Sequence, residues 1–166
     1  MIRAAVITVS DSAAAGVRED LSGPAVQKRA REFGWAIAHN SIVSDDRREI
    51  ASTLSSLADL GEVDVILTTG GTGLAPRDVT PEAARQVADR EAQGFGEMMR
   101  AEGRKSTKFA SLSRGGAFTR GSVLIVTLPG SPRGAVESLE AVAELIPHAV
   151  NLLHGNTEHG KKPALD

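Results

Sequence analysis

One segment of the chain, TTGGTGLAPRDVTP at residues 68–81, combines residue types that could bind phosphate and a divalent metal ion. Its first half holds three glycines and three threonines, and the candidate ligand-binding residues among them are Thr69, Gly70, Gly71, Thr72 and Gly73. Glycines let successive backbone amides approach an anion closely, and the threonine hydroxyls can donate further hydrogen bonds. The alternative is a tight turn that the glycines merely permit. The second half of the segment adds a carboxylate, Asp78, close to this turn.

Similar polar turns follow three other apolar segments. The residues that could contact a ligand there are Ser10, Asp11 and Asp20, then Asp45, and finally Pro129, Gly130 and Ser131. In open parallel α/β sheets the turns at the carboxyl ends of the strands meet at one edge, which is where ligands bind. Ser131 would also begin a helix, whose N-terminus attracts anions. Four polar turns at one sheet edge favour a binding site over a set of unrelated turns.

Asp45 and Asp78 are the candidate metal ligands, because Mg²⁺ binds one or two carboxylates together with phosphate oxygens and waters. A structural role is equally open for each. Asp45 could cap a helix, and Asp78 could form a turn and pair with Arg77. Asp11 and Asp20 could cap turns or form hydrogen bonds with a heterocyclic ligand.

Several other kinds of site are excluded or unsupported. The chain has no cysteine, which excludes disulfides, cysteine-based zinc or iron-sulfur sites and thiol nucleophiles. No G-x-G-x-x-G follows the first strand, and no G-x-x-x-x-G-K-[ST] occurs. A Ser-His-Asp triad has no G-x-S-x-G turn to support it. The histidines show no metal-ligand spacing; they are His39, His148, His154 and His159.

The elements that must position these residues alternate along the chain. Apolar, β-branched segments at 2–9, 36–43, 63–69 and 122–128 predict parallel strands that are buried on both faces. Helical patterns lie between them, and a last long helix is expected from 132 to 153. This alternation predicts an α/β fold with three layers, a mostly parallel sheet with helices on both faces. The glycine-rich stretch 103–121 predicts a hairpin or an extra strand pair.

Helix starts are marked by capping residues. Ser22 is expected to cap the first helix with Pro24 in its first turn, and Thr80 to cap the third with Pro81 next. Asp46 and Glu49 resemble a capping box, which makes a structural role the better interpretation of Asp46.

Length and charge indicate one globular domain over 1–154, followed by a polar tail at 155–166 that is expected to be flexible. The net charge of −2 at pH 7 gives no electrostatic reason to expect nucleic-acid or membrane binding. The N-terminus lacks the features of a signal peptide, and no apolar run approaches the roughly 20 residues needed to cross a bilayer. A cytoplasmic protein is expected.

Taken together, these residues resemble the molybdopterin adenylyltransferase family of molybdenum cofactor biosynthesis, which includes the G domain of gephyrin. The matching motifs occur in the family's order over nearly the whole chain. They are TVSDS (8–12), ED-x-SGP (19–24), IVSDD (42–46), LTTGGTG (67–73), RDVTPEA (77–83), GFGEMMR (94–100), LSRGGAF (112–118), LPGSP (128–132) and LIPHAVNLL (145–153).

The resemblance implies adenylyl transfer from ATP to molybdopterin with Mg²⁺, giving adenylyl-molybdopterin and pyrophosphate. Asp45 and Asp78 match the family's two catalytic aspartates and would hold Mg²⁺. Where relatives often have Pro-Asp-Glu, this chain has Ser44-Asp45-Asp46. Ser113 joins the other polar turns as a candidate substrate-binding residue.

The resemblance also implies a homotrimer and a possible partner that inserts molybdenum. Three alternatives stay open. The chain could be a pterin-binding or scaffolding paralogue without efficient transfer, or a nucleotide-processing enzyme of the CinA type on the same domain. It could also be a molybdenum-insertion enzyme, which uses the same domain but normally within a much longer chain.

Overall fold

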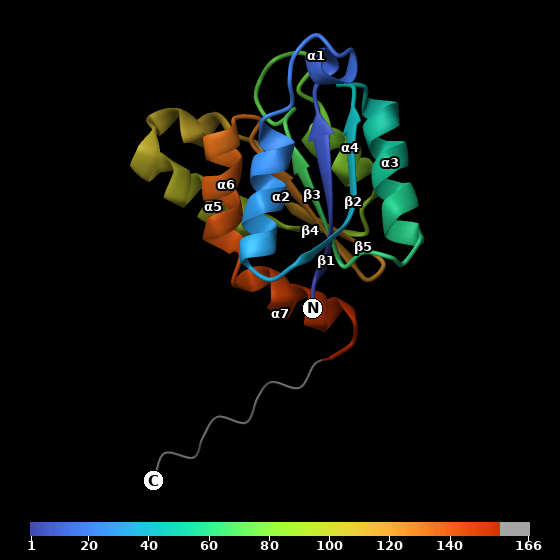
Figure 1. Ribbon diagram of the computed structural model, residues 1–166. Helices are drawn as coiled ribbons and strands as arrows, with labels where there is room; N and C mark the ends of the chain where they lie inside the picture. Colours follow the sequence, from blue (N-terminus) through green and yellow to red (C-terminus); the bar gives the residue numbers. More distant parts are fainter. Residues whose placement is uncertain (157–166) are drawn as a thin grey trace.

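Six strands form one sheet in the order β2-β1-β3-β6-β5-β4 in the computed structural model, which describes residues 1–156 (Figure 1). The strands β1, β2, β3 and β6 are parallel, whereas β4 and β5 run antiparallel to their neighbours. The bounds are β1 Arg3–Val9, β2 Ala36–Val43, β3 Val65–Thr69, β4 Arg90–Ala92, β5 Ala117–Arg120 and β6 Val123–Leu128.

Helices cover both faces of this sheet. They are α1 Asp11–Ala14, α2 Ser22–Glu32, α3 Arg47–Asp59, α4 Thr80–Val87, α5 Gln93–Ser106, α6 Pro132–Val142 and α7 Leu145–Leu153, with a short 3₁₀ helix, η1, at Lys108–Leu112. The predicted three-layer α/β fold is confirmed, and each of the four predicted strands lies within two residues of its expected bounds. In the part of the chain that is described, no helix combines the length and apolar composition needed to cross a bilayer.

The central strands are apolar on both faces because each face is covered. Successive residues of β1, such as Val6 and Ile7, point to opposite sides of the sheet and enter two separate cores. One core contains side chains from α2, α5, α6 and α7, and the other contains side chains from α3 and α4. The rigid three-strand centre β1-β3-β6 therefore fixes the turns at its carboxyl edge.

The expectation of burial on both faces is wrong for β2. This strand pairs only with β1, so it lies at the edge of the sheet. Its side chains alternate between partly buried and exposed positions, and Ile42 keeps 43% of its surface exposed. The apolar composition of the segment did not distinguish a central strand from an edge strand.

The predicted long C-terminal helix is also wrong, because α6 ends at Val142 and α7 begins at Leu145. Pro147 supplies the physical reason. It has no backbone N–H to donate, and its ring would clash with the carbonyl of Ala143 in a continuous helix. The prediction of a hairpin or an extra strand pair within residues 103–121 is only partly correct, because this stretch contributes one strand, β5, whose partners β4 and β6 lie outside it.

Of the capping residues, Asp46 behaves as predicted, and its carboxylate accepts the Glu49 amide at 2.9 Å. Ser22 and Thr80 lie inside their helices as first residues and do not cap them.

The N-terminus lies beside α7, at the end of the sheet opposite α1 (Figure 1). The two predicted domain bounds, 1–154 and 155–166, remain predictions, because residues 157–166, including His159, lie outside the described part of the chain.

Candidate active site

The turns that follow β1, β2, β3 and β6 meet at the carboxyl edge of the parallel strands. Together they line a cavity of about 460 Å³ that contains both candidate metal ligands. The predicted residues on its wall are Ser10, Asp20, Asp45, Thr69, Gly70, Gly71, Asp78, Gly130 and Ser131. We call it the acidic cavity.

A second cavity of about 320 Å³ adjoins the first one, and Gly130 and Ser131 line both. The remaining predicted residues lie here, namely Thr72, Gly73, Ser113 and Pro129. Side chains from α5 and η1 make its wall largely apolar, through Met99, Phe109 and Leu112. We call it the apolar cavity. Asp11 lines neither of the two.

Backbone geometry explains the glycines of the turn after β3. Gly70 has a φ of +105° and Gly71 a φ of +68°, which are unfavourable for residues with a side chain. A Cβ atom at Gly70 would lie 2.2 Å from the Val9 carbonyl oxygen, and one at Gly71 would lie 2.2 Å from the Thr80 hydroxyl. This turn therefore needs glycine for both conformation and space.

Two of the hydrogen-bond donors predicted for this edge, together with the Thr80 hydroxyl, are used inside the protein. The Gly70 amide donates to the Leu128 carbonyl at 3.1 Å, so it is not free for an anion. The hydroxyl of the fully buried Thr69 donates to the Pro129 carbonyl at 2.7 Å. Thr80 donates to the Gly70 carbonyl at 2.9 Å. These bonds connect the turns after β3 and β6 and fix the backbone of the glycine loop.

The amides that remain are those of Gly71, Thr72 and Gly73. Within residues 1–156 they have no hydrogen-bond acceptor. Such successive amides form an anion-binding concavity. The prediction that the glycine loop donates to phosphate is therefore narrowed to these three residues.

Asp11 and Asp45 bind each other's backbone. The Asp11 amide donates to the Asp45 carboxylate at 2.8 Å, and the Asp45 amide donates to the Asp11 carboxylate at 2.9 Å. Arg77 donates two hydrogen bonds to Asp11, so the pairing with Asp78 that was considered as an alternative is not observed. The Arg77 hydrogen bond lowers the pKa of Asp11. Burial raises the pKa of Asp45, and the negative charges of Asp11 and Asp78 raise it further.

Asp78 and Asp20 each close a local turn. The Asp78 carboxylate accepts the Ala75 amide at 2.9 Å and still lines the acidic cavity. Asp20 accepts hydrogen bonds from the Thr8 hydroxyl at 2.7 Å and the Gly23 amide at 2.9 Å, and so caps the turn that leads into α2. The capping role considered for Asp20 is thus observed.

The carboxylates and amides at this edge of the sheet fit a Mg²⁺ ion that arrives bound to a nucleotide better than a metal ion held by the protein alone. In the described residues no three histidine, aspartate or glutamate side chains converge closely enough to hold a metal. Two carboxylates with three free amides beside them match Mg²⁺, which takes few protein ligands when phosphate oxygens complete its shell.

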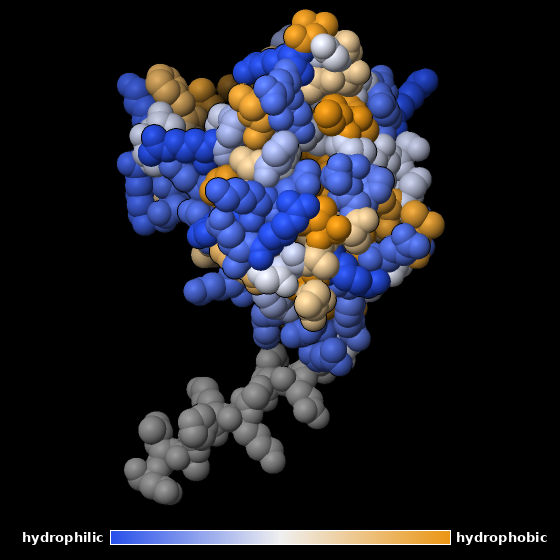
Figure 2. Space-filling model, viewed as in Figure 1, coloured by the Kyte–Doolittle hydropathy of each residue, from blue (hydrophilic) through white to orange (hydrophobic). Residues whose placement is uncertain are grey.

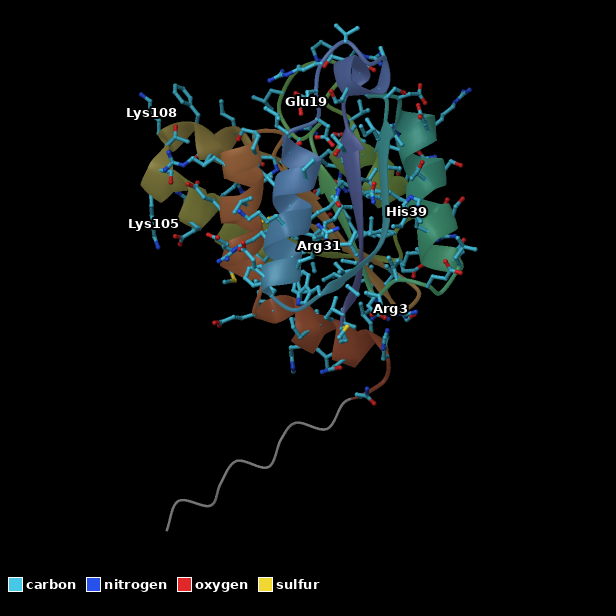
Figure 3. All side chains as sticks on the ribbon, in the orientation of Figure 1. Arg3, Glu19, Arg31, His39, Lys105 and Lys108 are labelled. Carbon is cyan, nitrogen blue, oxygen red and sulfur yellow. The ribbon has the colours of Figure 1, made fainter. Side chains whose placement is uncertain are left out.

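The surroundings of the acidic cavity include residues that the sequence did not single out. Arg18 and Glu19, in the connection between α1 and α2, line it, and Figure 3 shows Glu19 at this end of the molecule. Val17 and Leu21 in the same connection are exposed, and apolar surface appears at this end in Figure 2. Arg114 was also missed, although it lies in the LSRGGAF motif; its contacts are described below.

Comparisons with known proteins agree on one relationship. Residues 5–148 match a family described as "Probable molybdopterin binding domain". The chain is 43% identical over 157 residues to the molybdopterin adenylyltransferase of Helicobacter pylori, an alignment that covers 93% of this chain and 89% of that protein. It is 38% identical over 157 residues to the molybdenum cofactor biosynthesis bifunctional protein of Synechococcus elongatus, covering 95% of this chain and 49% of that protein.

Among solved structures, the crystal structure of the molybdopterin biosynthesis enzyme MoaB from Thermus thermophilus superposes with a TM-score of 0.88. Its sequence is 46% identical, and the match covers 93% of this chain and 98% of that chain.

Proposed function

Because the chain belongs to the family built on the molybdopterin-binding domain, we propose that it is a molybdopterin adenylyltransferase of molybdenum cofactor biosynthesis. It would transfer the adenylyl group of ATP to molybdopterin and release pyrophosphate. The observation that carries this proposal is the acidic cavity, where Asp45 and Asp78 lie beside the free amides of the glycine loop.

The reaction forms one bond and breaks one. A phosphate oxygen of molybdopterin attacks the α-phosphorus of ATP, and the bond between the α-phosphorus and the oxygen bridging to the β-phosphate breaks, so that pyrophosphate leaves. Phosphoryl and nucleotidyl transfers need little covalent help from the protein, and positioning with charge neutralisation supplies most of the catalysis. No nucleophilic side chain is required.

The chain's own residues would serve these two needs. Asp45 and Asp78 would hold Mg²⁺, which neutralises phosphate charge when it is bound. The amides of Gly71, Thr72 and Gly73 would donate hydrogen bonds to phosphate oxygens. The N-terminus of α6, capped by Ser131, adds a favourable dipole beside the same phosphates.

The two cavities suggest how the substrates are arranged. Each cavity would take one substrate, and the reacting phosphates would meet where Gly130 and Ser131 form the shared wall. The apolar cavity suits a planar ring, because Met99, Phe109 and Leu112 offer it apolar surface.

A homotrimer, a cytoplasmic location and transfer of the product to a molybdenum-insertion protein belong to the same proposal. The trimer and the molybdenum-insertion partner rest on the family resemblance. Light scattering of the purified protein would test the trimer, with three times the chain's own mass as the expected result.

Turnover by purified protein tests the function. With Mg-ATP and molybdopterin, the wild type should release pyrophosphate, and Asp45→Ala and Asp78→Ala should each lower the rate at least about tenfold. Asp46→Ala is the matched control, because this neighbouring aspartate caps α3 and does not line the acidic cavity. It should keep near wild-type turnover.

The same assay separates the alternatives. Intact molybdopterin binding without any turnover would identify a binding paralogue. Cleavage of ADP-ribose in the absence of molybdopterin would favour a CinA-type nucleotide-processing enzyme.

A further inference from the structure

Arg114 connects both ends of the loop that carries Asp78. Its backbone amide donates to the Thr72 carbonyl at 2.8 Å, and its Nε donates to the Gly73 carbonyl at 2.8 Å. At the other end of the loop, Nη2 donates to the Asp78 carbonyl at 2.6 Å, and Nη1 pairs with the Glu82 carboxylate on α4. A single side chain therefore spans the loop and the first turn of the helix that follows it.

The segment that carries Arg114 is itself fixed on two sides. Arg100 of α5 donates to the carbonyls of Ser113 at 3.3 Å and Gly115 at 3.0 Å. The Gly116 amide donates to the Thr127 hydroxyl of β6 at 3.0 Å. Because the residues on both sides of Arg114 are held by these hydrogen bonds, the backbone that carries the guanidinium group is fixed.

Charge and shape both suit arginine at this position. The Arg114 and Glu82 side chains are 33% and 32% exposed, so the ion pair is only partly screened by water. Burial raises the pKa of Glu82, but the hydrogen bonds from Arg114 and from its own backbone amide, together with the positive charges of Arg114 and Arg85, lower the pKa overall. The planar guanidinium donates in three directions at once, which a lysine ammonium on a flexible chain does not reproduce.

We propose that Arg114 is a positioning residue for the adenylyl transfer proposed above, holding the Asp78 carboxylate in place at the acidic cavity. Arg114 lines neither cavity, so it acts through the loop and does not touch the substrates. Its neighbours Ser113 and Gly115 line the apolar cavity, whereas its acceptor Asp78 lines the acidic one. Arg114 therefore also fixes the two proposed substrate sites relative to each other.

Arg114→Lys tests this role against Arg120→Lys as a matched control. Like Arg114, Arg120 binds a carboxylate and a backbone carbonyl through its guanidinium group: two nitrogens donate to Asp59 at 2.8 Å each, and the third donates to the Val87 carbonyl at 2.8 Å. Its side chain is 30% exposed, which is close to the value for Arg114, and it lines neither cavity. Both variants therefore lose guanidinium hydrogen bonds to a carboxylate and to backbone carbonyl oxygens. Only Arg114→Lys loses them at the loop that carries Asp78.

Two measurements distinguish a displaced Asp78 loop from a general loss of protein stability. In Arg114→Lys we expect amides 72–80 to exchange hydrogen at least about tenfold faster, with β1 and β3 unchanged, because local opening costs less free energy. We also expect the protein's dissociation constant for Mn²⁺-ATP to rise at least about fivefold, because Asp78 is no longer held at the metal. Arg120→Lys should change neither.

Glu82→Gln is the second variant, and it keeps the two carbonyl acceptors of Arg114. It should change exchange and Mn²⁺-ATP binding in the same direction, but less than Arg114→Lys. Equal effects of Arg114→Lys and Arg120→Lys, or a lower melting temperature with unchanged loop exchange, would overturn the proposal.

Failure of the proposed function would be seen separately. A wild type that releases no pyrophosphate would reject adenylyl transfer. The exchange comparison needs no turnover, so it would still decide whether Arg114 positions the loop.

Discussion

The carboxylates at the acidic cavity lie close to one another, and this arrangement lowers the stability of the folded protein. Asp45 lies near the carboxylates of Asp11 and Asp78, whereas Arg77 gives its hydrogen bonds to Asp11. Burial and these charges raise the pKa of Asp45, which means that its ionised form is disfavoured in the folded protein. Perturbed carboxylates of this kind concentrate at functional sites.

We therefore expect Asp45→Asn to separate stability from activity. The amide has the same size and can still accept the Asp11 amide, but it removes a disfavoured charge. In the presence of a chelator, the melting temperature at pH 7 should equal or exceed that of the wild type, while pyrophosphate release falls at least about tenfold. Asp46→Asn should leave both unchanged, because Asn and Asp cap helices about equally well. A lower melting temperature for Asp45→Asn would contradict this account.

The sequence predicted which residues share the edge better than it predicted their partners. Asp45 and Asp78 follow strands, and position after a strand is enough to place them at the carboxyl edge. Hydrogen-bond partners depend on which turns meet in space. Thr69 binds Pro129, Arg77 binds Asp11 and Arg114 binds Asp78, each across a long stretch of sequence. Nothing local in the sequence encodes those pairs.

Among the elements, the loop between β3 and α4 is the one whose shape depends most on residue identity. Gly71 combines a φ of +68° with a site where a Cβ atom would meet the Thr80 hydroxyl. Gly121, in the turn between β5 and β6, has a φ of +53° but open space around it. The two glycines differ in steric surroundings and share the left-handed conformation.

This difference predicts unequal costs for alanine. Gly121→Ala should lower the free energy of unfolding by about 1 kcal/mol, the cost of the left-handed conformation alone. Gly71→Ala should cost about 2 kcal/mol or more, because the methyl group also displaces Thr80 from the Gly70 carbonyl. Urea unfolding of both variants measures the difference. Equal costs would show that Thr80 moves aside freely.

Strands and helices could be predicted from the sequence where their burial in the fold agreed with the local pattern of apolar residues. The strands β1, β3 and β6 are buried on both faces, so their apolar runs are unambiguous. The edge position of β2 depends on the strand order, which a single segment does not contain. The break between α6 and α7 has a local signal in Pro147, which the continuous apolar stripe on both sides of it obscures.

For the molecule as a whole, the two ends of the sheet have different roles. The proposed active site lies at the carboxyl ends of the parallel strands. A cluster of stabilising interactions lies at their amino ends, where Figure 3 labels Arg3. Asp64 is only 5% exposed and accepts the Arg3 amide and Nη2, each at 2.7 Å. His154, after α7, lies 3.7 Å from the same carboxylate. The start of β1, the residue before β3 and the end of α7 thus meet at one side chain.

Asp64→Asn should destabilise the protein in a pH-dependent way. Although burial opposes it, hydrogen bonding from Arg3 lowers the pKa of Asp64 below 3.8. Its charge therefore stabilises the fold fully above about pH 4, and this contribution disappears as the pH falls through the lowered pKa. At pH 7 we expect a loss of about 2 kcal/mol, because the charged hydrogen bonds to the buried carboxylate are weakened while the Arg3 side chain, which is 45% exposed, stays hydrated.

Chemical denaturation from pH 7 to pH 2 provides the measurement, and the gap between Asp64→Asn and the wild type should narrow below about pH 4. Asp59→Asn serves as the control, since Asp59 also pairs with an arginine but its side chain is 58% exposed. Such exposed pairs contribute about 1 kcal/mol or less. A gap for Asp64→Asn that is constant over this pH range would contradict the assignment.

The position of the N-terminus has a practical consequence. Met1 lies beside α7, and residue 156 follows α7 shortly after, so both ends of the described chain leave the molecule away from the two cavities. An affinity tag, a surface tether or a fused second protein attached at the N-terminus would leave the route for substrates open. The domain can therefore be anchored at this end while its opposite edge stays accessible.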